Sequence, residues 1–183
     1  MRTLLAAVAL ALAPAAVAQP LQTGAALPLA SQSFATADGQ TLTLGGAAKS
    51  AGTMVVFWAN RCAWADRNAE RLTNLVTTFG DRFGVVVVSS TPLAAAPGEV
   101  PVVVDGTGAL VRAFGVQRAP QAFVFNASGT LAYTGAFDDS PADAAAARKH
   151  YAADALTAVA AGQTPAVATS EAFGCIVRPP AGQ

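Results

Sequence analysis

Apolar residues recur in two patterns along the chain, and together they predict alternating buried strands and amphipathic helices. Uninterrupted, valine-rich apolar runs occupy residues 53–58, 83–89 and 100–104. Such runs, bounded by Gly, Pro or Asp, are typical of strands buried on both faces of a sheet. Two more apolar-rich segments, 121–126 and 130–137, flank the turn residue Gly129 and predict a hairpin.

Apolar positions spaced by three and four predict the helices. A helix over residues 62–79, ending at Gly80, has its apolar stripe at Ala65, Ala69, Leu72, Val76 and Phe79. Residues 107–114 predict a shorter helix. A long final helix is expected from Ser140, which could cap it, to Gly162, because Pro141 suits the first helical position. Its expected buried stripe is Ala152, Ala155, Leu156 and Val159.

The N-terminal residues 1–18 have the features of a cleavable signal peptide. Arg2 supplies a positive charge, residues 4–12 are apolar, and Ala16-Val17-Ala18 suits cleavage after Ala18. An apolar stretch of about ten residues is shorter than the roughly 20 that a membrane-spanning helix needs. A membrane anchor or a buried helix is the alternative interpretation. A signal peptide predicts a periplasmic or secreted protein, where a disulfide can form and persist.

After the signal peptide, residues 19–33 are polar and interrupted by proline, which suggests an N-terminal arm. Residues 34–44 alternate apolar and polar positions around the Asp38-Gly39 turn, which predicts a small hairpin. The rest of the chain is long enough for one domain with a single substantial core.

The charge composition excludes several classes of function. The chain has 11 basic and 11 acidic residues, so no basic surface for nucleic acid is expected. One histidine, His150, and two cysteines are too few for a zinc or haem site, and we expect neither a metal nor another cofactor. The adjacent Asp138 and Asp139 are expected to end a strand and position the next helix rather than to act as a catalytic pair.

The two cysteines, Cys62 and Cys175, are the residues most suggestive of chemistry. Cys62 follows a strand and begins a helix, where free N–H groups and the helix dipole favour a thiolate. The guanidinium of Arg61 would favour it further, unless Arg61 is simply a solvated surface residue. Three interpretations of Cys62 stay open: a redox nucleophile, half of a structural disulfide with Cys175, or a small buried apolar side chain.

The order of the elements resembles that of the thioredoxin superfamily, with a cis-proline expected at Pro120. Short segments narrow this to the redoxins of the alkyl hydroperoxide reductase and thiol-specific antioxidant group, which is peroxiredoxin-like. The segments are Phe57-Trp58-Ala59-Asn60-Arg61-Cys62-Ala63-Trp64, Pro120-Gln121-Ala122-Phe123-Val124-Phe125, Tyr133-Thr134-Gly135-Ala136-Phe137-Asp138-Asp139, and Gly174-Cys175 with Arg178. The resemblance implies an α/β, thioredoxin-like fold: a central mixed sheet flanked by helices, extended by the N-terminal hairpin. The redoxin domain would span residues 34–165, and a tail, 166–183, would carry Cys175.

Some positions depart from the pattern of these families. Thioredoxin-type enzymes use Cys-x-x-Cys, but Ala59 and Ala65 occupy the positions three residues either side of Cys62. Ala59 also stands where peroxiredoxins place a threonine or serine that holds the peroxide. Cys175 is therefore the only residue that could resolve an intermediate on Cys62, across a loop worth up to about 4.7 kcal/mol of stability if the bond is purely structural.

The sequence thus predicts an extracytoplasmic thiol-dependent oxidoreductase with antioxidant, peroxidase-like or thiol–disulfide exchange activity. Cys62 would be the nucleophile and Cys175 its resolving partner, while Arg61, Arg118 and Pro120 would stabilise the thiolate or bind substrate. For Arg118, as for Arg61, the alternative is a solvated surface residue. The substrate would be a protein or small-molecule thiol, a disulfide or a peroxide. The alternative is a non-catalytic thioredoxin-fold binding module in which both cysteines are structural or idle.

Overall fold

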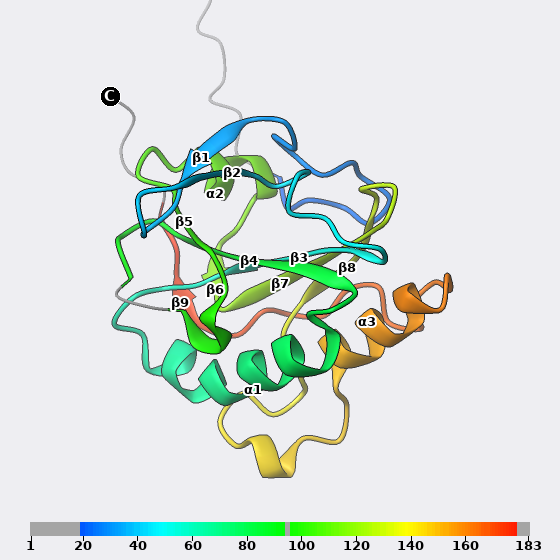
Figure 1. Cartoon of the computed structure of the whole chain (residues 1–183). Helices are drawn as coiled ribbons and strands as arrows, with labels where there is room; N and C mark the ends of the chain where they lie inside the picture. The colour runs from blue at the N-terminus through cyan, green and yellow to red at the C-terminus, as the bar shows by residue number, and fades with distance from the viewer. Residues whose placement is uncertain (1–18, 94–95, 179–183) are drawn as a thin grey trace, which may run out of the picture.

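The computed structural model describes residues 19–93 and 96–178. The predicted signal peptide, residues 1–18, lies outside the described residues. A twisted layer of strands runs through the centre of the molecule (Figure 1). Its strands are β3 (Gly52–Phe57), β4 (Phe83–Ser89), β5 (Val102–Val104), β7 (Gln121–Asn126) and β8 (Leu131–Gly135).

The central strands combine parallel and antiparallel pairing. β7 lies between β3 and β8 and is antiparallel to both, while β4 and β5 form a parallel pair. β4 runs beside β3 in the same direction: the N–H of Ala51 donates to the carbonyl of Arg82 at one end, and that of Trp58 donates to the carbonyl of Val88 at the other. The predicted mixed sheet is confirmed.

Helices cover both faces of this layer (Figure 1). On one side lie α1 (Ala63–Phe79) and α3 (Tyr151–Ala160); on the other lie α2 (Ala109–Phe114) and the hairpin of β1 (Ser33–Ala35) and β2 (Thr41–Thr43). Successive β3 side chains enter opposite cores: Val56 packs in the α1 and α3 core, and Val55 in the core on the other face. Burial on both faces explains why the strand sequences are continuously apolar.

The N-terminal part of the described chain contains the expected hairpin. In the hairpin, Phe34 pairs with Leu42 across the Asp38-Gly39 turn. Ahead of it, the arm packs against the domain: Leu27 is buried, and its backbone N–H donates to the carbonyl of Gly129. Within the described ranges, no helix combines the length and the apolar character needed to cross a membrane.

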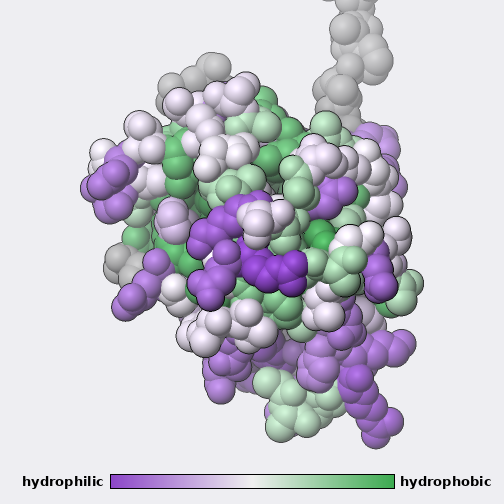
Figure 2. All heavy atoms as spheres, turned by 45° about the vertical axis from the view of Figure 1, so that its right-hand side comes forward, coloured by the Kyte–Doolittle hydropathy of each residue, from purple (hydrophilic) through white to green (hydrophobic). Residues whose placement is uncertain are grey.

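The prediction of a long helix over residues 140–162 is wrong for the first half of that range. Only Tyr151–Ala160 forms an α-helix, preceded by a 3-10 turn, η2 (Ala144–Ala146). The Asp139 carboxylate accepts hydrogen bonds from the backbone N–H groups of Arg148 and Lys149, which ties these residues into a loop. Figure 2 shows hydrophilic side chains on both sides of the lower end of this face, with a weakly hydrophobic group between them. The predicted buried stripe of the helix is confirmed.

The C-terminal tail returns to the sheet after α3. Thr169 forms a parallel bridge with Thr134 of β8. The tail then adds a two-residue strand, β9 (Cys175–Ile176), that pairs antiparallel with β6 (Arg118–Ala119). Figure 1 shows β9 running beside β6 at one side of the molecule. The tail therefore places Cys175 against the segment that precedes Pro120.

Candidate redox site

Cys62 lies at the junction between β3 and α1, as the sequence predicts. It is the N-cap residue of α1, with extended backbone angles, and its carbonyl accepts a hydrogen bond from the N–H of Asp66. Just before it, Arg61 has a left-handed φ of 55°, which turns the chain into the helix. Only 1% of the Cys62 surface is exposed. The sulfur is therefore held at the helix N-terminus and shielded from solvent.

Cys62 and Cys175 form a disulfide. Their α-carbons are 6.2 Å apart, within the roughly 7 Å that a disulfide can bridge, although 113 residues separate them in sequence. The structure thus brings together the two cysteines that the sequence could not place relative to each other. Of the three interpretations of Cys62, the idle buried side chain is excluded, while the nucleophile and the structural bond stay compatible with the pairing.

The pairing of β6 with β9 sets the position of Cys175. Ala119 lies opposite Cys175 in the ladder, and Arg118 lies opposite Ile176. The Ala119–Pro120 peptide bond is cis, as expected. The Cys62 sulfur is 3.9 Å from the carbonyl oxygen of Ala119, so the cis-proline segment borders both cysteines.

Gly174 allows the tail to approach β6 closely. It is buried, and a Cβ at this position would lie 1.9 Å from the carbonyl oxygen of Ala119. A side chain of any size would therefore push the tail away from β6. The guanidinium of Arg118 donates a hydrogen bond of 3.0 Å to the carbonyl of Gly174, which fixes the tail from the other side.

Aromatic contacts hold the residue two positions before Cys175. The rings of Phe173 and Trp64 meet edge to face, with centroids 4.5 Å apart and an interplanar angle of 88°. The guanidinium of Arg67 lies 5.7 Å from the centre of the Trp64 ring, within the range of a cation–π contact. Phe173 itself remains 46% exposed. Trp64 thus links the first turn of α1 to the tail.

The two predicted arginines lie in different surroundings. Arg118 belongs to β6 and contacts the tail through Gly174. Arg61 is exposed in the loop ahead of Cys62. His150 is also exposed and is the N-cap residue of α3.

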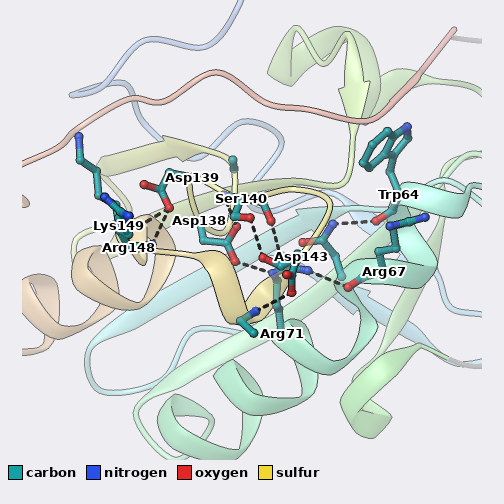
Figure 3. Close-up of polar contacts among 12 residues, drawn as sticks. Trp64, Arg67, Arg71, Asp138, Asp139, Ser140, Asp143, Arg148 and Lys149 are labelled. Carbon is teal, nitrogen blue, oxygen red and sulfur yellow. Dashed lines mark hydrogen bonds and ion pairs between the residues drawn. The ribbon is translucent and has the colours of Figure 1, made fainter.

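An ion pair that the sequence does not predict joins α1 to the loop after β8. Arg71 and Asp138 are paired, with side chains only 10% and 6% exposed. The Arg71 guanidinium also donates to the carbonyl of Ser140, so it joins α1 to the loop after β8 (Figure 3). Asp138 lies in the Tyr133-to-Asp139 segment that the sequence singles out, whereas Arg71 lies outside the predicted apolar stripe of the helix and no local pattern pairs the two.

Ser170 anchors the tail before it reaches the disulfide. The backbone N–H of Ala136 donates to the Ser170 hydroxyl oxygen at 3.0 Å, and that hydroxyl lies 2.7 Å from the Tyr133 hydroxyl. Tyr133 in turn donates to the carbonyl of Ala136. Burial raises the pKa of Tyr133 well above its usual value, although the hydrogen bond from Ser170 opposes this shift. The tyrosine is therefore neutral at physiological pH.

The strand order, the cis-proline and the cysteine at the start of the first core helix define a protein with a thioredoxin fold. The chain belongs to the Redoxin family, whose model matches residues 22–150. Cys62 and Pro120 lie inside the matched region, whereas Cys175 lies beyond it. No curated protein sequence matches the chain.

Solved structures share this fold at low sequence identity. An uncharacterised conserved protein from Geobacillus kaustophilus has a TM-score of 0.77 at 20% identity, covering 87% of this chain and 94% of its own. A hypothetical protein from Sinorhizobium meliloti has a TM-score of 0.76 at 23% identity, covering 90% and 98%. The peroxidoxin BcpB of Mycobacterium tuberculosis has a TM-score of 0.58 at 16% identity, covering 77% and 97%. At these identities the similarity shows the fold alone.

Proposed function

We propose that the protein is a thiol-dependent oxidoreductase that cycles between a Cys62–Cys175 disulfide and a dithiol. The observation that carries this proposal is the pairing of Cys175 with a cysteine at the N-terminus of α1. A helix N-terminus lowers the pKa of a thiol and so favours the nucleophilic thiolate. Arg61, next to Cys62 in sequence, would add to this effect, and Arg118 and Pro120 would border the incoming substrate.

The cycle needs only the two cysteines. In the reduced protein, the Cys62 thiolate attacks a sulfur of the substrate disulfide and forms a mixed disulfide, while the second substrate sulfur leaves as a thiolate. The Cys175 thiolate then attacks the Cys62 sulfur, forming the Cys62–Cys175 disulfide and releasing the first substrate sulfur as a thiolate. Two electrons have passed from the protein to the substrate. A thiol donor returns the protein to the dithiol state.

A disulfide suits this site better than a peroxide. Ala59 has no hydroxyl with which to hold a peroxide, and its side chain packs against the apolar core instead. Cys62 is shielded by the tail, which occupies the edge beside Pro120 as an extended strand. A polypeptide could take the same place. A putative thiol:disulfide interchange protein, DsbE of Chlorobium tepidum, shares the fold with a TM-score of 0.54, and its name is in keeping with this chemistry.

We place the activity outside the cytoplasm. Residues 1–18 have the charge, the apolar stretch and the small residues of a signal peptide. A long-range disulfide is also stable in an oxidising compartment and is rarely kept in a reducing one. Mass determination of the protein isolated from its source would test this proposal, with Gln19 as the expected first residue.

Trapping experiments with single cysteine variants test the catalytic role. Reduced Cys175→Ser should form a stable mixed disulfide with a protein disulfide through Cys62, because no resolving thiol remains. Reduced Cys62→Ser should form several-fold less, because Cys175 lacks the helix N-terminus and its thiol is therefore ionised to a smaller extent near neutral pH. Equal trapping by the two variants would contradict the assignment of Cys62 as nucleophile. Measuring peroxide consumption by the same proteins would show whether the substrate that oxidises Cys62 is a peroxide or a disulfide.

A structural disulfide in a non-catalytic binding module is the second candidate. It is favoured by the 1% exposure of Cys62, which leaves little room for a reagent while the tail is docked. In that case the folded protein would keep its disulfide in mild thiol reductant, and the wild type would transfer no electrons to disulfides or peroxides. Steady turnover with a thiol donor would exclude this candidate.

A further inference from the structure

β6 is a sheet edge that, within the described residues, only the tail covers. Two residues of β9 pair with it, and the N–H of Val177 donates to the carbonyl of Gln117 just beyond. If β9 leaves, the carbonyl of Gln117 and the backbone of Ala119, which lies opposite Cys175, lose these partners. An edge with free backbone groups binds extended polypeptide segments by strand addition.

We propose that this edge and Trp64 together bind a segment of another protein that has an aromatic residue, a glycine and a cysteine in succession. That segment takes the place of Phe173, Gly174 and Cys175, so the tail is an internal mimic of the partner. The inference rests on the proposed function, because it assumes that Cys62 exchanges disulfides with a protein. Beyond that function, it specifies which amino-acid sequence around the partner's cysteine the site prefers.

The position before the cysteine has to be glycine. The buried backbone of Gly174 passes so close to Ala119 that a Cβ would meet both the carbonyl oxygen, at 1.9 Å, and the carbonyl carbon, at 2.4 Å. These are backbone atoms of a paired strand and cannot move aside without breaking the ladder. A partner segment in the same register meets the same atoms.

The position two before the cysteine is aromatic because it meets the ring of Trp64. The contact with Phe173 is edge to face, an arrangement that aromatic pairs favour over stacking face to face. A small cavity lined by Pro120, Phe137 and Asn68 adjoins the Phe173 ring. Phe173 is half exposed, so the site can accept a larger ring than the one the tail provides.

The tail and the partner compete for one place, and the redox state of Cys175 decides the competition. Ser170 stays bonded to Tyr133 and Ala136 only five positions before Cys175. This tether keeps the local concentration of the tail near β6 high. While the Cys62–Cys175 disulfide is intact, the tail occupies the β6 edge at all times. Reduction removes the covalent bond, and the edge then becomes available to a partner. In the exchange, the Cys62 thiolate bonds to the partner's cysteine sulfur, and the second sulfur of the partner's disulfide leaves as a thiolate.

The test uses the reduced full-length Cys175→Ser variant and synthetic peptides. The parent peptide is Glu-Ala-Phe-Gly-Cys-Ile-Val-Arg, the sequence of residues 171–178, with its cysteine carrying a nitrothiobenzoate disulfide as a coloured leaving group. One matched peptide has alanine in place of the phenylalanine, and another has alanine in place of the glycine. The variant's own tail slows all three reactions alike, so the ratio of the rate constants is the readout.

We expect the parent peptide to react about 10-fold faster than either alanine peptide. For phenylalanine this is the size of effect that one aromatic contact and its buried area supply. For glycine it follows from the overlap of the added Cβ with the carbonyl of Ala119. With an added Trp64→Ala change, the phenylalanine-to-alanine ratio should fall to about one, while the glycine-to-alanine ratio should persist. Trp64→Phe should restore part of the first ratio. These results together would support the edge as a sequence-selective site.

The outcomes separate this inference from the proposed function. Cys62 could react with a small nitrothiobenzoate disulfide and with all three peptides at equal rates. That result would contradict the sequence selectivity of the β6 edge but would still support thiol–disulfide exchange by Cys62. If Cys62 reacts with none of the reagents, the proposed function fails, and the inference fails with it. If reduced and reoxidised wild type forms Cys62–Cys175 linked dimers in preference to peptide adducts, the edge belongs to a second copy and the proposal is overturned.

Discussion

The hydroxyl of Ser170 lies 2.7 Å from that of Tyr133, at the point where the tail reaches β8. With Ala136, the two side chains form a closed ring of hydrogen bonds. The ring satisfies the hydroxyl of a fully buried tyrosine, and the tail is therefore part of the folded domain up to Ser170. Beyond this anchor, Cys175 is held by β6, Trp64 and its disulfide. The attachment of the tail at Ser170 therefore does not depend on redox state, whereas its attachment at Cys175 does.

Replacing Ser170 with alanine should loosen the tail without removing the disulfide. The N–H of Ala136 loses its acceptor, which should lower the free energy of unfolding by about 1–3 kcal/mol. The disulfide should also be reduced faster by a small thiol, because its tether is weaker. Urea unfolding and the rate of thiol release check both effects. Thr169→Ala is the matched control, since this residue is exposed and contacts β8 through its backbone; equal effects in both variants would contradict the anchor.

The stability of the protein should fall at high pH through Tyr133. Its pKa is raised in the folded state because burial disfavours the phenolate. The contribution of the neutral tyrosine is therefore complete below the unfolded pKa of about 10 and is lost as the pH rises above that value. Urea unfolding from pH 8 to 11, compared between wild type and Tyr133→Phe, checks this dependence. The two stability curves should converge as the pH increases; parallel curves would contradict it.

Gly174→Ala should release β9 from β6. The new methyl group would overlap the carbonyl of Ala119, so the ladder and the contact of Arg118 with the tail cannot both persist. We expect the disulfide of the folded variant to be reduced at least 10-fold faster, which corresponds to about 1.4 kcal/mol of lost tail binding. Gly106→Ala is the control, because a Cβ there meets no atom within 4 Å. Similar reduction rates in both variants would show that Gly174 does not set the approach of the tail.

Arg71→Met should destabilise the fold without altering the cysteines directly. It leaves the nearly buried Asp138 without its ion-pair partner and frees the carbonyl of Ser140. Loss of one partner of a buried pair costs about 3–5 kcal/mol, and partial exposure places this pair at the lower end. The urea midpoint should fall with an unchanged slope. Arg148→Met, at an exposed position, should change stability by less than about 0.5 kcal/mol; a comparable loss there would contradict the role of the pair.

The strands and the first helix could be predicted because their patterns are strong and local. The valine-rich runs of β3 and β4 are buried on both faces, and Ala65 and Leu72 mark the buried side of α1. The helix expected from Ser140 failed for an equally physical reason. Asp139 offers the backbone of residues 148 and 149 hydrogen bonds that compete with a helix, and local propensity does not reveal such a distant acceptor.

The sequence by itself determined the fold class, the position of Cys62 at a strand-to-helix junction and the cis-proline at Pro120. These follow from short-range periodicity, from turn residues and from a resemblance carried by short segments. Only the tertiary structure decided that Cys175 reaches Cys62 and that Ser170, Gly174 and Trp64 hold the tail in place. The reason is that 113 residues separate the two cysteines. At that separation, the contact depends on how the whole domain folds and not on any local pattern.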